Sequence, residues 1–180
     1  MNKLNPGTRI LTMLLDHFSM CLLMMLIVLP SMLMDMAEMF KHPNTQPPLF
    51  LGNYYLFALA FSLYFNKDIY LGRSLSKRIF KFQVVNFKTN KVASPLRCLV
   101  RNLTIVFWPI EAIVAIIDNE RRIGDYLAGT KLTIYNPEIH AVPFNWLQAI
   151  ASLLIAGFVT YFAIFYPMEL FFQSLGVPMH

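Results

Sequence analysis

The sequence predicts an all-α integral membrane bundle with a small cytoplasmic segment that holds an amphipathic helix and a pair of β-strands. Hydrophobic residues make up 57% of the 180 residues, and the mean hydropathy is +0.52, whereas soluble domains are about 45–50% apolar. The excess is concentrated in a few long runs, which indicates membrane helices. Basic residues are concentrated between two of these runs. The pattern favours three full transmembrane helices plus a re-entrant hairpin, with four full spans as the alternative.

The first two apolar runs predict transmembrane helices. The first, residues 10–34, is long enough to cross about 30 Å of hydrocarbon at about 1.5 Å per residue. Thr8 is its expected N-cap, and Pro30 is expected to kink it or mark its exit. Residues 35–48 are polar and proline-rich, and they predict a loop. The second span is expected over residues 49–65, with tyrosines towards its ends as in an aromatic belt.

Residues 66–101 are strongly basic. They hold nine of the fifteen basic residues and a single acid, Asp68, so the segment should be cytoplasmic, and the N-terminus with it. Leu71, Leu75, Ile79 and Phe82 recur at near-helical spacing between basic residues, which predicts a short amphipathic helix on the membrane surface. Residues 82–85 then predict a strand, followed by a polar turn at 89–90 and a second short strand.

Residues 102–117 are apolar but short for a span, and Pro109 and Glu111 interrupt them. Basic residues flank the run on both sides, which favours a hairpin that enters the bilayer and returns; a tilted full span is the competing interpretation. Gly129 predicts a helix stop, and residues 130–135 predict a strand that pairs with residues 81–85. That pairing requires both segments on one face of the membrane and therefore favours the hairpin.

The chain divides into a membrane domain, residues 1–135, and a linker with a C-terminal transmembrane helix, residues 136–180. The last span is expected over residues 146–172, with Trp146 as an interfacial anchor. The net charge of +5 is interpreted as membrane topology and not as nucleic-acid binding, because no soluble basic domain is visible.

Ionisable residues inside apolar runs are the candidate functional residues. Arg9 and Asp16 are seven residues apart and share a helix face. A carboxylate at the depth of Asp16 must be protonated, paired or hydrated, which is equally consistent with an ion or proton path and with a structural ion pair. Taken alone, Arg9 is expected to snorkel towards lipid phosphate. Glu111 is expected to bond backbone amides freed near Pro109 or to line a cavity. Asp125, beside two arginines, is by itself expected to be a solvated charge.

No sequence feature predicts an enzyme. The chain contains no HExxH, P-loop or GxGxxG motif and no Ser–His–Asp spacing. Cys21 and Cys98 lie in or beside apolar stretches and have no CxxC spacing, so neither a disulfide nor a metal site is expected. We therefore expect no catalytic residue, no cofactor and no metal ligand.

Several stretches, taken in order, resemble the RDD family of bacterial membrane proteins, which is named for one arginine and two aspartates. In that family the first helix carries an arginine and, seven residues later, an aspartate, here Arg9 and Asp16. A Gly-x-x-x-Gly-Lys-Arg type loop leads into a strand, here Gly72 to Lys77, Arg78 and residues 82–85. The remaining matches are Arg101, Asn102 and Leu103, and then Asp125, Leu127, Ala128, Gly129 and Thr130. The resemblance covers residues 5–135. Thr12 and Ser76 depart from the pattern, at positions where the family has a small residue and a glycine.

The resemblance implies that Arg9, Asp16 and Asp125 form an ion or charge network, which argues against a snorkelling Arg9 and a solvated Asp125. The expected supporting residues are Arg101, Asn102, Glu111 and Arg122. The family is suspected of transport, and one member looks like a sodium/proton antiporter. The resemblance also implies a multi-pass protein of the bacterial inner (cytoplasmic) membrane.

Two functions follow from these expectations. In the first, the protein transports or exchanges a monovalent cation or proton, or is associated with transport; Asp16 binds the ion, and Arg9 and Asp125 control its charge state. A homodimer or a partner membrane subunit would then enclose the path, because the bundle is small. In the alternative, the protein is a non-transporting accessory or assembly subunit of a membrane complex, and the charges form a buried structural network.

Overall fold

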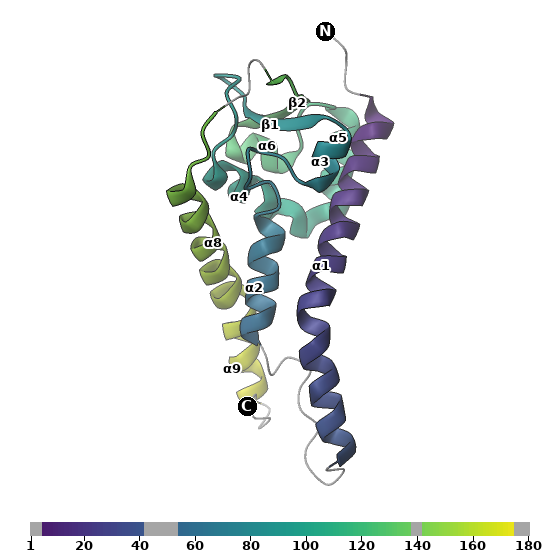
Figure 1. The fold of residues 1–180 in the computed structure, drawn as a ribbon, viewed down its shortest axis with the longest axis vertical. Helices are drawn as coiled ribbons and strands as arrows, with labels where there is room; N and C mark the ends of the chain where they lie inside the picture. The colour runs from purple at the N-terminus through teal and green to yellow at the C-terminus, as the bar shows by residue number, and fades with distance from the viewer. Residues whose placement is uncertain (1–4, 42–53, 138–141, 175–180) are drawn as a thin grey trace.

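A computed structural model of the chain describes residues 5–41, 54–137 and 142–174. The described part is mostly helical, with one two-stranded sheet. Helices α1 (Pro6–Lys41), α2 (Tyr54–Phe65) and α8 (Trp146–Thr160) extend from one end of the molecule, where the sheet and the short helices form a cap (Figure 1). Helix α8 continues through a π-helical turn, Tyr161–Phe165, into α9 (Tyr166–Ser174).

Three apolar helical stretches among the described residues are long enough to cross a membrane: Pro6–Lys41, Pro95–Ile117 and Trp146–Ser174. The first and the last are helical where spans were predicted. Large apolar side chains on α1, such as Phe18 and Leu26, are exposed in the isolated chain, as expected of a helix that faces lipid. Helix α2 is shorter as described, and residues 49–53 of its predicted span lie outside the described residues.

The first helix differs from the prediction at both ends. It begins at Pro6 and not after Thr8, because the side-chain oxygen of Asn5 accepts a hydrogen bond from the Gly7 amide at 2.9 Å. Pro30 lies inside the helix, which continues to Lys41. The prediction of a loop over residues 35–48 was therefore wrong for residues 35–41, and its remainder lies outside the described residues.

The predicted strand pairing is confirmed. Strand β1 (Phe82–Asn86) pairs antiparallel with β2 (Thr130–Ile134), in a register that places Phe82 opposite Ile134. The second short strand expected after the turn is reduced to one bridge between Val85 and Val92. The sheet therefore joins segments nearly fifty residues apart on one side of the molecule.

The amphipathic helix is shorter than the apolar spacing predicted. Helix α3 covers only Leu75–Ile79. The preceding residues Leu71 and Gly72 have φ values of 55° and 66°, and the Gly72 carbonyl oxygen accepts a hydrogen bond from the Val84 amide at 3.0 Å. A Cβ at residue 72 would lie 2.6 Å from the Val84 carbonyl oxygen, so this close turn requires glycine. Leu75 and Ile79 are exposed on α3, as expected of an apolar face at a membrane surface.

The short apolar run belongs to a longer helical segment than predicted. Helix α4 (Pro95–Leu103) begins inside the expected loop and is followed by a 3₁₀ turn, Thr104–Phe107, and by α5 (Trp108–Ile117). Both ends of this segment lie at the sheet: Val92 bridges Val85, and the Glu120 carbonyl accepts a hydrogen bond from the Leu132 amide at 2.9 Å. The sheet thus holds the two flanks together.

Helix α6 (Ile123–Ala128) packs directly against α4. It ends at Gly129, whose φ of 62° confirms the predicted helix stop. At its start, Gly124 faces α4 so closely that an added Cβ would lie 2.0 Å from the Arg101 carbonyl oxygen and 2.4 Å from Thr104 Oγ1. The contact between the two helices therefore depends on the absence of a side chain at residue 124.

We predict that Gly124→Ala separates α6 from α4 and lowers the free energy of unfolding by at least about 1–3 kcal/mol, the usual cost of overpacking. Gly157→Ala is the matched control, because no atom outside its own helix lies within 4 Å of a Cβ at that position. Thermal unfolding of both variants in detergent measures the difference. Equal midpoints for the two variants would show that α4 and α6 are not held in this contact.

Candidate functional site: a buried charge network

Eight charged side chains are buried where the cap meets α1. They are, among the described residues, the basic Arg9, Lys77, Arg101 and Arg122 and the acidic Asp16, Asp68, Glu111 and Asp125. Their formal charges cancel, and each side chain is at most 5% exposed. Isolated buried charges are strongly unfavourable, so this arrangement is stable only if each charge has a partner.

Arg9 and Asp16 lie on one face of α1, as predicted, but they reach different partners. Arg9 Nη2 lies 3.7 Å from Asp125 Oδ2, and Nη1 donates to the Asn119 carbonyl oxygen. Asp16 Oδ2 lies 2.6 Å from Lys77 Nζ. The expectation that Arg9 snorkels is wrong, because the residue is only 1% exposed. Helix α1 therefore contacts the cap at two separate ion pairs.

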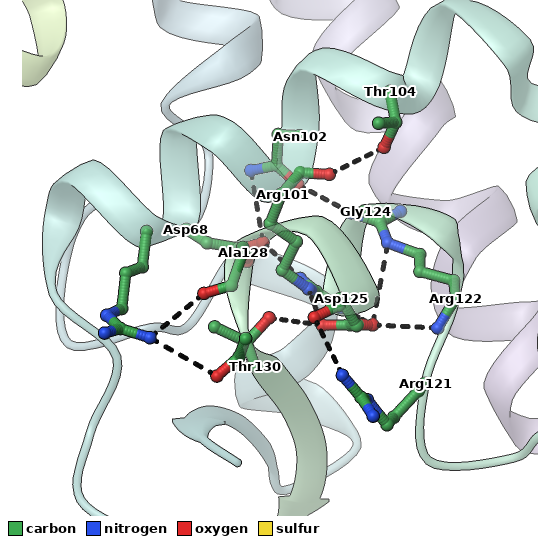
Figure 2. Close-up of polar contacts among 12 residues, drawn as sticks. Asp68, Arg101, Asn102, Thr104, Arg121, Arg122, Gly124, Asp125, Ala128 and Thr130 are labelled. Carbon is green, nitrogen blue, oxygen red and sulfur yellow. Dashed lines mark hydrogen bonds and ion pairs between the residues drawn. The ribbon is translucent and has the colours of Figure 1, made fainter. Parts of the chain in front are cut away.

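Arg101 connects these two contacts. Its Nε donates to Asp125 Oδ1 at 2.5 Å, and its Nη1 donates to Asp68 Oδ2 at 2.9 Å. Figure 2 shows the Arg101 side chain extending from α4 towards Asp125. Asp68 in turn lies 2.8 Å from Lys77 Nζ. The ion pairs thus form a continuous series of alternating charge from Asp16 to Asp125.

Asp125 is the most heavily contacted carboxylate. Guanidinium groups of Arg9, Arg101 and Arg122 lie within 4.0 Å of it, the Thr130 hydroxyl donates at 2.7 Å, and the Arg122 amide donates at 3.1 Å. Burial alone would raise the pKa of the Asp125 carboxyl, but Arg101, Arg122 and the hydrogen bonds outweigh burial and lower the pKa to about 2. Asp125 is therefore a fixed anion and not a solvated charge.

The supporting residues named from the sequence also belong to the network. Glu111 Oε2 lies 3.1 Å from Arg122 Nη1, and its Oε1 accepts hydrogen bonds from the Gly124 amide at 3.0 Å and from the Thr104 hydroxyl. Asn102 accepts from Arg122 Nη2 at 2.7 Å and donates to the Phe65 carbonyl oxygen at 3.0 Å. The amide that Glu111 binds is the Gly124 amide on α6, and not one freed near Pro109, which was one of the two expectations for this residue.

Four contributors were not predicted as site residues: Asp68, Ser76, Lys77 and Thr130. Ser76 Oγ donates to Asp16 Oδ1 at 2.5 Å. The sequence offered one signal, since Asp68 is the single acid in a segment of nine basic residues. Lys77 was expected among the basic residues between the apolar ones of the amphipathic helix, and it is buried, with its ammonium paired to Asp16 on α1. Both departures from the family pattern, Thr12 and Ser76, are buried beside Asp16.

A cavity of about 20 Å³ lies within the network. Its lining includes Asp16, Lys67, Lys77, Arg9 and Arg122, and the buried Nε atoms of the two arginines have no hydrogen-bond partner among the described residues. A polar cavity of this size can hold about one water molecule. Burial lowers the pKa of the Lys67 ammonium to about 7, despite the attraction of Asp16. Lys67 is therefore the lining residue that can change its charge near neutral pH.

Other candidate groups lie outside the network. His17 is exposed on α1, where its Nδ1 lies 2.6 Å from the Tyr64 hydroxyl. Cys21 is exposed and Cys98 is buried, and both are free thiols. Within the described ranges, no group of three or more His, Cys, Asp or Glu side chains is arranged to hold a metal ion.

We predict that Asp125→Asn lowers the free energy of unfolding by on the order of 3–5 kcal/mol, because it leaves three buried arginines without their common anion. Glu120→Gln, a neutralisation at an exposed residue, should change stability little. Wild-type stability from Asp125 is present above its unfolded pKa of about 4 and is lost as the pH falls towards about 2. The Asn variant should lack this component of acid denaturation. Equal melting temperatures for the two variants at pH 7 would contradict the pairing.

The comparisons with known proteins identify a family. The RDD family model matches residues 5–129, which includes Arg9, Asp16 and Asp125. No curated protein matches the chain, and no solved structure matches it. The matched residues make up well over half of the 180 residues and contain every charged member of the network. This chain belongs to the RDD family.

Proposed function

We propose that the protein exchanges a proton or a monovalent cation at Asp16, as a transporter or as a transport-associated subunit of the membrane. The observation that carries the proposal is the pairing of Asp16 on α1 with the Lys77 ammonium, 2.6 Å away, at the edge of a water-sized cavity. We assign the protein no enzymatic reaction.

Asp16 differs from Asp125 in the kind of cation that it contacts. Asp125 is held by three guanidinium groups, which stay charged and bind carboxylates in a fixed geometry. Asp16 is held by a lysine, a compact point charge on a flexible stem, and by the Ser76 hydroxyl. A proton or a sodium ion can compete with such an ammonium for the carboxylate. Asp16 is therefore the carboxylate of the network best suited to exchange.

Lys77 also has a second anion available. Its Nζ lies 2.8 Å from Asp68 Oδ1, so it can leave Asp16 without becoming an unpaired buried cation. Lys67 lines the same cavity, and its pKa of about 7, lowered chiefly by burial, allows it to accept or release a proton near neutral pH. These two lysines supply a physical basis for coupling the charge of Asp16 to a proton.

The alternative is a non-transporting accessory or assembly subunit. The balance of four buried cations against four buried anions favours it, as does a cavity no larger than about 20 Å³. In that role the network fastens the cap to α1. Under either function, a homodimer or a partner membrane subunit would supply the surface that completes a path or a complex.

We predict that Asp16→Asn abolishes proton- or sodium-gradient-driven flux in proteoliposomes while expression stays near normal, because the amide keeps the shape and removes the exchangeable charge. Asp35→Asn is the matched control, since it makes the same change on α1 outside the network. Undiminished flux in the Asp16 variant would exclude Asp16 as the exchange site. Wild-type protein without flux, combined with a lower melting temperature for Asp16→Asn, would support the accessory function.

We also propose the orientation of the chain. The sheet and its basic flanks would face the cytoplasm, with α4, the 3₁₀ turn and α5 forming a hairpin that enters the bilayer from that side. The support for the hairpin is that both flanks of the segment lie at the sheet, through Val92 and Glu120. The support for the orientation is the concentration of basic residues in residues 66–101, because lysine and arginine are enriched on the cytoplasmic side of a membrane. The membrane that we propose is the bacterial inner membrane.

We predict that Lys91→Cys and Glu120→Cys both react with an impermeant maleimide only after the cells are permeabilised. Lys41→Cys, at the opposite end of α1, should react in intact cells. The background carries Cys21→Ser and retains Cys98, which is buried. If Glu120→Cys but not Lys91→Cys reacts in intact cells, the segment between them is a full span and not a hairpin. If both react in intact cells, the orientation is the reverse of the one proposed.

A further inference from the structure

An open hollow of about 790 Å³ lies on the cap, outside the charge network. It is formed by the turn after β1, by the first two turns of α4 and by the end of α6. Its lining contains three basic residues, Lys88, Arg97 and Arg121, and no acidic residue. A concave surface of one sign favours an anionic occupant.

Arg121 is held in place before any ligand binds. Its guanidinium lies between two aromatic rings, 3.9 Å from the ring centroid of Tyr126 and 4.2 Å from that of Phe87. One Nη donates to the Asp125 carbonyl oxygen at 3.4 Å, while the buried Nε has no hydrogen-bond partner among the described residues. A guanidinium that is already held in position loses little conformational entropy when it binds a phosphate.

Arg97, on α4, is a second basic residue in the lining of the hollow. One of its Nη atoms donates to the carbonyl oxygens of Ala128 and Gly129, at 3.1 Å and 3.4 Å. These contacts anchor an otherwise exposed side chain at the C-terminal end of α6. Arg97 and Arg121 therefore line one hollow from two different segments, and Lys88, on the turn after β1, lines it as well.

The same hollow has an apolar side. Val100 is 43% exposed and Leu127 is 67% exposed in its lining. Beyond Val100 along the same helical segment, Val106 and Phe107 are also exposed. Exposed apolar side chains therefore occur both in the hollow and further along the same helical segment. This combination fits an amphiphile with an anionic head group better than it fits a soluble phosphate.

We propose that this hollow binds one anionic phospholipid, with its phosphate at Lys88, Arg97 and Arg121 and its acyl chains along Val100, Leu127 and Phe107. Basic pockets beside membrane helices are suited to such head groups. The lipid would hold α4, α6 and the turn after β1 together at the membrane surface. The site is separate from Asp16, so it does not depend on the exchange proposed above.

The test is lipid binding to delipidated full-length protein in detergent, measured by native mass spectrometry and by the shift in melting temperature. Phosphatidylglycerol should bind as a one-to-one adduct and raise the melting temperature, whereas phosphatidylcholine should do so much less. The double variant Lys88→Gln/Arg97→Gln should bind phosphatidylglycerol on the order of tenfold more weakly or worse. The matched control, Arg78→Gln/Lys91→Gln, removes two exposed basic residues from the same cap outside the hollow and should bind like wild type.

Three outcomes would overturn the proposal. If the control variant weakens phosphatidylglycerol binding as much as the test variant does, the effect is one of general charge. If phosphatidylcholine binds as tightly as phosphatidylglycerol, the hollow is an apolar surface only. If glycerol phosphate raises the melting temperature as much as phosphatidylglycerol does, the hollow is a site for soluble phosphate. If Lys88→Gln/Arg97→Gln does not fold, Lys88→Glu replaces it, because the hydrogen bond of Lys88 to Asn86 uses its backbone amide. Unchanged lipid affinity in that variant would also overturn the proposal.

Discussion

Arg101 lies between Asp68 and Asp125, and the rest of the site depends on these two ion pairs. Asp68 connects Arg101 to Lys77, and through it to Asp16 on α1, while Asp125 connects Arg101 to Arg9 on the same helix. Buried ion pairs repay their desolvation cost only when all members are paired. Removal of one member would therefore leave its neighbours in the series as buried charges without a partner. The ion pairs thus hold the cap and α1 together as one unit.

The apolar cores around this network are small. One cluster lies under the sheet, around Val84, Cys98 and Leu132, and another lies between the long helices, around Phe65 and Leu99. Neither apolar cluster connects α6 to α1, and the ion pair between Arg9 and Asp125 makes this connection. A shift of the cap relative to α1 would leave buried charges of this network without their partners, which is strongly unfavourable. We interpret this network as the element that selects one arrangement of cap and bundle.

The two ends of the series differ in chemistry, and this difference connects structure to function. At Asp125 the cations are arginines, whose charge and geometry are fixed. At Asp16 the cation is Lys77, and Lys67 lines the adjoining cavity. The arginine end is suited to hold the cap on α1. The exchange that we propose would use only the lysine end, at Asp16 and Lys77.

Local sequence patterns determined much of this protein. Hydropathy located α1, α2 and α8, Gly129 marked the end of α6, and residues 82–85 and 130–135 were predicted as strands that pair. The seven-residue spacing placed Arg9 and Asp16 on one face of α1, and resemblance to the family added Asp125. Only the tertiary structure showed that Asp68 and Lys77 belong to the network. The sequence of a five-residue helix such as α3 does not distinguish a buried lysine from an exposed one. The partners of Asp16 and Arg9 are 61 and 116 residues away along the chain, and no local periodicity records contacts over such separations.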